Sequence, residues 1–234
     1  MTFPAVVADR AVEVTKVAGA TVAAHFGDPG REYEAARHGV GLAHRSRRAL
    51  FRVSGSDRCK FLQALLTSDV SGLERGEGQA SLFLDNKGHV RGVLDLWAED
   101  DAVLAGCDVG FVESVLPDLE RYVLAADVSI EDRRDHETVI AVHGVESEDS
   151  LSGAGLPIPA EAPHAHITGT IAGAKVRFAR TPDLGTLGVE VHVPTGAIDD
   201  VWAALEEAMR DFVPVYVGWN IAEVLRVEAG ITSF

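Results

Sequence analysis

The 234-residue sequence has little cysteine, only four lysines and no long apolar run. Neither Cys59 nor Cys107 belongs to a spacing that holds zinc, and the pair His164 and His166 has no third ligand nearby, which argues against a disulfide scaffold and a metal site. No stretch approaches the about 20 apolar residues that cross a bilayer, and the first residues lack a basic start followed by an apolar run. We therefore expect a cytoplasmic protein without a membrane partner or a bound metal.

Basic residues are scarce relative to acidic ones. The chain has 21 lysines and arginines against 36 aspartates and glutamates, which gives a formal net charge of -15. Such a charge repels phosphate backbones wherever salt does not screen it. Nucleic acid is therefore not an expected partner.

Hydrophobic residues make up 47% of the chain, enough for one large domain or two small ones with a proper core. The first part of the chain predicts, in order, a strand at 50–53, a helix capped by Ser56, a hairpin that turns at 86–88, a helix after residue 112 that Pro117 shortens or kinks, and an edge strand at 125–132. A looser version of this order follows residue 137. The pattern predicts an α+β fold of two related halves with mixed antiparallel sheets.

One strand of the second half alternates strictly. Its apolar residues are Leu187, Val189, Val191 and Val193. Glu190 and His192 therefore lie on the opposite face of the strand, where solvation is the simplest interpretation. Apolar residues from Ile198 to Phe212 then recur at helical spacing and predict an amphipathic helix.

Four stretches together resemble the folate-binding domain that the glycine-cleavage T-protein (aminomethyltransferase) shares with the YgfZ-like proteins. They are the opening segment 31–78, FLDNKGHV at 83–90, RTPDLGTLGVEVHVPTGAIDDVWAAL at 180–205 and VGWNIAEVLRVEAGI at 217–231. The resemblance implies two ferredoxin-like halves around a central pocket, here 1–136 and 137–234, with tetrahydrofolate as the ligand. The small barrel domain that follows in YgfZ-like proteins is absent from this sequence.

By this resemblance, Asp95 is the catalytic candidate. In the family's enzymes, an acidic pair after the hairpin turn works on the amine nitrogen of tetrahydrofolate. Gly92 and Val93 hold those two positions here, and Asp95 shares a strand face with one of them. An acid between two leucines is also typical of the outward residue of an alternating strand.

The enzymes' motif R-T-G-Y-T-G-E-x-G-x-E aligns without gaps to the segment from Arg180 to Glu190. Asp183 and Thr186 stand where the tyrosine and the first glutamate belong. The last glutamate is kept as Glu190, and it resembles the residue that accepts hydrogen bonds from the pterin ring. The resemblance therefore makes Glu190 and Arg180 candidates for binding the folate.

The last signature adds two further candidates, Arg226 and Glu228, for which a salt bridge or solvent exposure is the alternative. Ala222 stands where the enzymes place an arginine, four residues upstream of Arg226. A separate basic cluster is either a solvated edge or an attraction for the anionic glutamate tail of a folate. Its members are Arg45, Arg47, Arg48 and Arg52.

The lost positions favour the YgfZ-like branch over a transferase, because each buried group left unpaired costs about 1–3 kcal/mol. The resemblance ties that branch to iron–sulfur cluster assembly or repair, although its cysteine motif is missing here. We therefore predict a tetrahydrofolate-binding YgfZ-like protein with iron–sulfur assembly proteins as partners. Two alternatives remain: a folate-dependent aminomethyltransferase that uses Asp95, and a decayed folate domain that acts as a scaffold. The sequence leaves open whether the protein is an enzyme.

Overall fold

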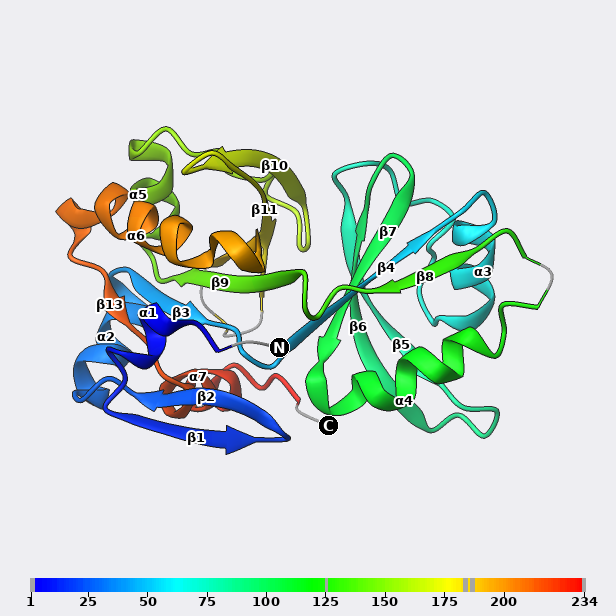
Figure 1. The fold of residues 1–234 in the computed structure, drawn as a ribbon, viewed down its shortest axis with the longest axis horizontal. Helices are drawn as coiled ribbons and strands as arrows, with labels where there is room; N and C mark the ends of the chain where they lie inside the picture. The colour runs from blue at the N-terminus through cyan, green and yellow to red at the C-terminus, as the bar shows by residue number, and fades with distance from the viewer. Residues whose placement is uncertain (1–2, 125, 183–184, 186–187, 233–234) are drawn as a thin grey trace.

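The chain folds into two units that lie side by side (Figure 1). The computed structural model describes residues 3–124, 126–182, 185 and 188–232. We call residues 48–132 the antiparallel unit, and residues 3–44 with 137–232 the mixed unit, after their main sheets. No helix among these described residues is both long and apolar enough to cross a bilayer.

The antiparallel unit contains a five-stranded sheet in which all neighbouring strands are antiparallel. In spatial order the strands are β5 (Gly78–Leu84), β6 (Val90–Ala98), β7 (Ala102–Asp108), β4 (Arg48–Ser54) and β8 (Ser129–Asp132). Helices α3 (Arg58–Leu65) and α4 (Val109–Glu120) pack on this sheet and close an apolar core around Phe51, Leu62 and Val115.

The mixed unit contains a six-stranded sheet in which only the pair of β13 and β3 is parallel among the described strands. In spatial order the strands are β10 (His166–Ile171), β11 (Ala174–Arg180), β12 (Gly188–Pro194), β9 (Glu137–His143), β3 (Gly41–His44) and β13 (Val215–Tyr216). The hairpin of β1 (Glu13–Val17) and β2 (Ala20–His25) forms a separate two-stranded sheet.

Helices cover parts of both faces of the mixed sheet. Leu42 and Ile140 face the core with α1 (Ala5–Ala8), α5 (Ser147–Gly153) and α6 (Ile198–Ala208), whereas Ala43 and Ala141 face α2 (Pro29–His38) and α7 (Trp219–Glu228). The short 3-10 helices η1 (Thr195–Ala197) and η2 (Arg210–Phe212) flank α6. Small alanines on the second face let α2 and α7 approach the sheet closely.

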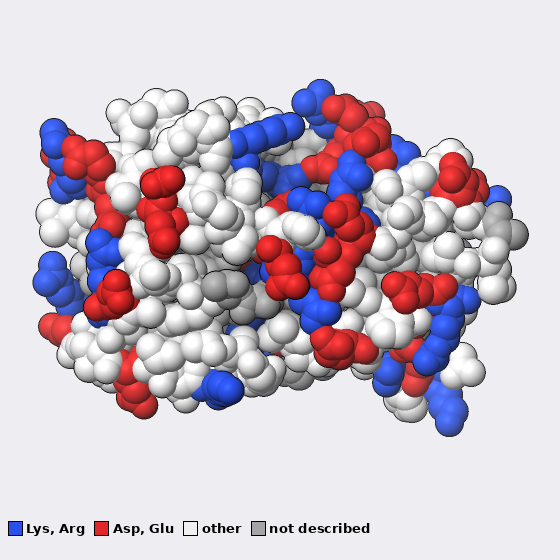
Figure 2. Space-filling model, viewed as in Figure 1, with Lys and Arg blue, Asp and Glu red and all other residues white. Residues whose placement is uncertain are grey.

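The two units meet along a seam that is apolar in its centre and charged at its rim. Leu50, Trp97 and Leu104 of the antiparallel unit pack against Val139 and Ala179 of the mixed unit. Figure 2 shows acidic and basic side chains intermixed in a band between the units.

Ion pairs cross the seam, among them that of Arg177 on β11 with Glu99 of the antiparallel unit. On the face of β12 that lies at the seam, the His192 ring packs against Trp97, with the ring centroids 4.7 Å apart.

The α+β class and the mixed antiparallel sheets are confirmed, and several local predictions are confirmed as well. The hairpin turns at Gly88, whose φ of +81° suits glycine. The predicted helix is present as α4, which contains Pro117 and ends three residues later at Glu120; that Pro117 shortens or kinks it stays a prediction. Ser56 does not cap α3, because Asp57 takes the N-cap position and the Ser56 hydroxyl donates to Asp127. Leu187, at the start of the predicted alternating strand, lies outside the described residues.

Sheet membership does not follow the expected boundary between 1–136 and 137–234. Strand β3 lies between β9 and β13, so the residues up to His44 belong with the mixed unit. Strand pairing over long sequence distance is not encoded in local periodicity, which is why the pattern did not reveal this exchange. The division of the chain into the domain halves 1–136 and 137–234 stays a prediction.

Candidate functional site

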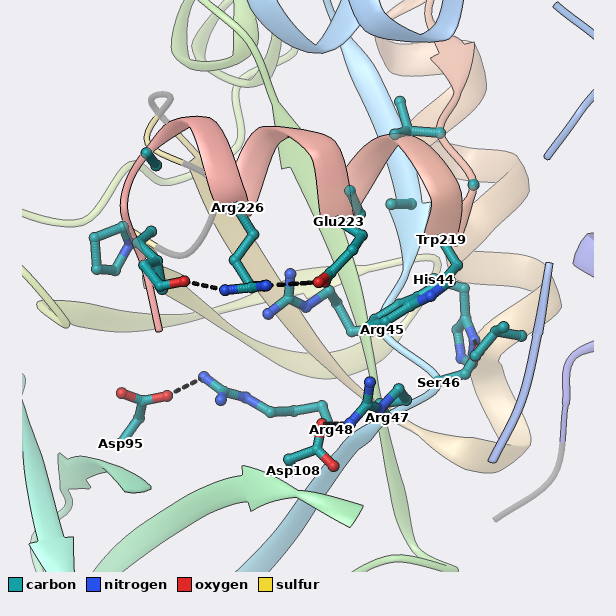
Figure 3. Close-up of a pocket in the computed structure, with 18 of the residues that line it drawn as sticks. His44, Arg45, Ser46, Arg47, Arg48, Asp95, Asp108, Trp219, Glu223 and Arg226 are labelled. Atoms are coloured by element: carbon teal, nitrogen blue, oxygen red, sulfur yellow. Dashed lines mark hydrogen bonds and ion pairs between the residues drawn. The ribbon is translucent and has the colours of Figure 1, made fainter. Parts of the chain in front are cut away.

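A cavity of about 560 Å³ opens where the two units meet. Its walls come from the segment between β3 and β4, from β6, from β2 and from α7, so both units contribute. Apolar side chains, including Val93, Phe111 and Val217, line one part of it. Charged side chains line the rest, as Figure 3 shows for the labelled residues.

The connection between β3 and β4 and the first residue of β4 supply three of the cavity's arginines, each with an acidic partner. Arg48 Nη2 lies 2.5 Å from Asp95 Oδ2, and Arg47 Nη2 lies 2.7 Å from Asp108 Oδ2. Arg45 Nε lies 3.3 Å from Glu190 Oε1. Acids therefore balance the cationic lining, which weakens the expected attraction for a glutamate tail.

The fourth member of the predicted basic cluster lies elsewhere. Arg52 pairs with Glu99 and Asp101 and is not part of the lining.

Asp95 lies in the cavity wall on β6 and is 8% exposed. Its partner across the sheet is Gly106, where a Cβ would come within 3.2 Å of Arg48 Nε and 2.9 Å of the Trp97 ring. The missing side chain at Gly106 thus leaves the passage through which Arg48 reaches Asp95 from β4 (Figure 3). A guanidinium group this close to a carboxyl group stabilises the ionised form of that carboxyl group.

Glu190 lies beneath the cavity and is fully buried. Burial alone would raise the pKa of its carboxyl group, but Arg48, His192 and Arg45 together hold that pKa below its usual range. The predicted strand face is therefore correct but faces the antiparallel unit rather than solvent. Glu190 contacts two arginines that line the cavity and is not itself part of the lining.

Arg226 of α7 lines the cavity and pairs with Glu223 at 2.5 Å (Figure 3). Glu228 pairs instead with Arg37 and Tyr33 of α2, because residues two apart on a helix point in different directions. Arg180 binds Glu148 of α5 on the far side of the mixed sheet.

The structure thus brings Asp95 and Arg226 to one cavity and places Glu228 and Arg180 outside it. Asp183 and Thr186 lie outside the described residues. What each of these residues binds stays a prediction.

Trp219 and His164 are lining residues that were not predicted as site residues. Trp219, the first residue of α7, carries Arg47 over its ring at 4.6 Å from the centroid. His164 lines the cavity beside Asp95, whereas His166 turns away and its ring nitrogen bonds the carbonyl oxygen of Ala98. The H-x-H pattern was the only sequence signal for His164, and two imidazoles without a third ligand did not indicate a site.

A buried hydrogen-bond chain supports the cavity floor. The ring of His44 lies 2.6 Å from the Ser46 hydroxyl and 2.7 Å from the Thr138 hydroxyl. Burial lowers the pKa of His44 to about 4, so the ring is neutral at pH 7. Among the described residues, no group of three or more metal-binding side chains is arranged around a common point.

Comparisons with known proteins agree on one family. The family model described as GCVT N-terminal domain matches residues 4–234. The aminomethyltransferase of Chloroherpeton thalassium is 29% identical over 87% of this chain, and that of Mycobacterium leprae is 30% identical over 85%. The chain covers 57% and 54% of these two proteins, so it spans about half the length of the curated relatives it matches.

Solved structures agree in fold. The glycine cleavage system aminomethyltransferase T from Bartonella henselae superposes with a TM-score of 0.87 at 20% identity, over 97% of this chain and 62% of that one. A chain of the heterotetrameric sarcosine oxidase from Corynebacterium sp. U-96 matches with a TM-score of 0.58 at 16% identity, over 81% of this chain and 94% of that one. The predicted T-protein fold is therefore confirmed.

The two curated relatives and the Bartonella henselae protein are all named aminomethyltransferases. The comparisons therefore favour the T-protein-like alternative over the YgfZ-like prediction. The long opening stretch and the three later signatures identified this relationship correctly. The chain belongs to the GCVT N-terminal domain family, the folate-binding family of the glycine-cleavage T-protein.

Proposed function

We propose that the chain binds tetrahydrofolate in the cavity between its two units, as the folate-binding module of a T-protein-like system of one-carbon metabolism. The observation that carries this proposal is the cavity itself. Its volume of about 560 Å³ lies within the range of small-molecule sites, and it combines an apolar wall with a few converging polar groups. That combination suits a flat, partly polar ring system with an anionic extension.

The residues around the cavity fit such a ligand. Val93 and Phe111 offer an apolar surface to a flat ring, and the Asp95 carboxylate offers an acceptor to ring N–H groups. Glu190 acts from beneath: by pairing with Arg45 and Arg48 it fixes the arginines that border the site. We assign it a positioning role in place of the direct pterin contact that the resemblance implied.

A second candidate function is aminomethyl transfer to the folate, which the position of Asp95 favours. Tetrahydrofolate, when bound, supplies the amine nitrogen that receives the one-carbon unit. Asp95, ionised beside Arg48, provides a carboxylate that can hold a proton-bearing nitrogen in place. The Asp95→Asn variant should then lose turnover and keep folate binding, whereas equal losses of both would reduce Asp95 to a binding residue.

Iron–sulfur chemistry is not part of this proposal. Burial raises the pKa of the Cys107 thiol to about 12, and Cys59 is only half-buried within the first turn of α3. Cys107 therefore offers no activated thiolate. A cytoplasmic location and iron–sulfur partners stay predictions from the sequence.

Tryptophan fluorescence tests the binding proposal. Trp97 and Trp202 are 1% and 0% exposed, so a ligand in the cavity should act on the emission of Trp219. We expect a saturable change on titration with tetrahydrofolate, and its loss in the Trp219→Phe variant. A flat titration up to millimolar ligand in the wild type would remove the proposal and favour a scaffold for partner proteins.

A further inference from the structure

Strand β10 forms one edge of the mixed sheet, and β11 is its only strand partner among the described residues. Figure 1 shows β10 in the upper part of that unit. A strand edge exposes a row of unpaired backbone N–H and C=O groups, and proteins commonly protect it with charged side chains, prolines, short strands or covering segments. An edge without such protection is a site for pairing with another strand.

The other described edge strands are protected. Strand β13 has two residues, most of β2 is buried, and the backbone N–H of Thr67 donates to the carbonyl oxygen of Leu82 beside β5. The remaining two carry charged side chains, which are Glu13 and Lys16 on β1 and Glu131 and Asp132 on β8. In β10, by contrast, the segment from Ile167 to Ile171 reads ITGTI and has neither a charge nor a proline.

The backbone groups of Thr168 and Thr170 point away from the sheet. The carbonyl oxygen of Ala165 accepts a hydrogen bond from the last residue of β11, so every second residue from Ala165 onward directs its backbone groups toward β11. The residues between them point outward, as the bond from the His166 N–H to the carbonyl oxygen of Gly76 shows. Both threonines are exposed, so this edge is open to solvent.

The open segment reads the same in both directions around Gly169. Two such strands that run antiparallel about a twofold axis at Gly169 place Thr168 of each copy opposite Thr170 of the other. Each of these pairs joins outward-pointing backbone groups, so it can exchange both of its hydrogen bonds. Cross-strand pairs of threonines are favourable in themselves.

The same register covers an exposed apolar side chain. Ile167 is 42% exposed, whereas Ile171 belongs to the core of the mixed unit. Both side chains lie on one face of β10, and the register places Ile167 opposite Ile171 of the second copy. These are non-hydrogen-bonded pairs, in which side chains approach each other most closely. The pairing therefore buries Ile167 against apolar surface.

The surroundings of the segment suit this pairing. After Ile171 the chain turns back at 172–173, where both residues have positive φ, so the second copy's strand ends before it reaches Gly76. The basic residues Lys175 and Arg177 lie opposite β10 on β11. Across the joined sheets they are three strand spacings, about 14 Å, from those of the second copy. Salt screens most repulsion over this distance.

We propose that β10 is a dimerisation edge, at which two copies of this chain join their mixed sheets into one. The contact uses the same strand on both sides, and it does not depend on the cavity or its ligand. One pair of short strands is a small interface. We therefore expect a transient dimer with a Kd of about 10–100 µM rather than an obligate one.

Sedimentation equilibrium of the wild type up to about 300 µM measures the dimer, and two charge variants test the register. Thr168→Glu/Thr170→Glu places like charges opposite each other in both pairs, while in the monomer the new acids lie beside the basic side chains of β11. Thr168→Glu/Thr170→Lys places opposite charges in both pairs, and it does so only in this register. Ser129→Glu/Ser152→Glu adds two acids at exposed serines away from β10 and is the control.

We expect the double-glutamate variant to dimerise at least about tenfold more weakly than the wild type, and the glutamate–lysine variant at least as tightly as the wild type. The control should stay within about twofold of the wild type. A wild type that is monomeric at about 300 µM would overturn the inference and leave the edge to a strand of another protein. A control as weak as the double-glutamate variant would also overturn it, as would a glutamate–lysine variant that dimerises no better than the double-glutamate variant.

Discussion

Replacing Glu190 by glutamine should destabilise the protein more than any comparable change to a surface acid. The substitution keeps the volume of the side chain and removes only its charge. In the folded protein this charge is fully buried and faces Arg45, Arg48 and His192. Without this charge, the buried guanidinium groups keep fewer negative partners. Removing one member of a buried ion pair is strongly destabilising, because the other charge stays buried and uncompensated.

The magnitude follows from the partners that remain. Removing one member of a buried pair costs about 3–5 kcal/mol, and Arg48 keeps Asp95, so the lower end applies: about 3 kcal/mol. For a chain of 234 residues this corresponds to a fall in Tm of about 6–12 °C. Since single domains are stable by about 5–15 kcal/mol, such a loss is large.

Thermal unfolding at pH 7, followed by circular dichroism, measures the effect. The matched control is Glu207→Gln, because Glu207 pairs with Arg210 on the surface and both side chains are about 70% exposed. Exposed pairs contribute little, so the control should shift Tm by less than about 2 °C. Equal shifts in Tm for the two variants would show that the buried charge of Glu190 stabilises the fold no more than an exposed charge does.

The pH dependence gives a second check on Glu190. Because the folded protein lowers the pKa of this carboxyl group below its ordinary 4.5, its stabilisation is complete above pH 4.5 and is lost as the pH falls toward the folded pKa. The gap in stability between wild type and Glu190→Gln should therefore be constant from pH 7 to 5 and narrow in stronger acid. A gap that widened in acid would contradict this assignment.

Three further predictions concern other parts of the fold. Burial lowers the pKa of His44 from 6.5 to about 4, so unfolding between these pH values takes up a proton. The free energy of unfolding, measured in urea, should therefore fall by up to about 3 kcal/mol from pH 6.5 to pH 4. The His44→Asn variant should show a flatter pH profile, and a profile equal to that of the wild type would contradict this assignment. Gly78→Ala should cost about 1–3 kcal/mol and shift the NMR signals of the His164 ring, and a silent substitution would show that the segment yields freely. A thiol reagent should label Cys59 in the folded protein and reach Cys107 only in urea; earlier labelling of Cys107 would contradict its buried, high-pKa state.

Local elements were predictable because their signals are local. The turn at Gly88, the helix with Pro117 and the alternation around Glu190 each depend on neighbouring residues, and the structure contains all three. The family was predictable because its motifs extend along most of the chain. Helix α6 followed from its apolar stripe, although it ends at Ala208 and a 3-10 turn leads on to Phe212.

The candidate site was only partly predictable, since it is built from segments that meet through the fold. Alternation shows which face of a strand carries Glu190, but not that a second sheet covers this face. A motif places Arg180 and Glu228 near the expected pocket, whereas side-chain direction takes both elsewhere. His164 and Trp219 reach the cavity from distant loops and helix ends, and no periodicity marks them.

We propose that the cavity between the units holds a reduced folate. A calorimetric titration of tetrahydrofolate into the wild type and into the Ala80→Phe variant tests this proposal. Ala80 is a solvent-exposed residue of β5 that lines the cavity. A larger side chain at this position fills the site without disturbing the core. We predict one saturable site in the wild type and at least about tenfold weaker binding in the variant, with Tm changed by less than about 2 °C. Equal affinity in the two proteins, or no binding to the wild type, would contradict the account.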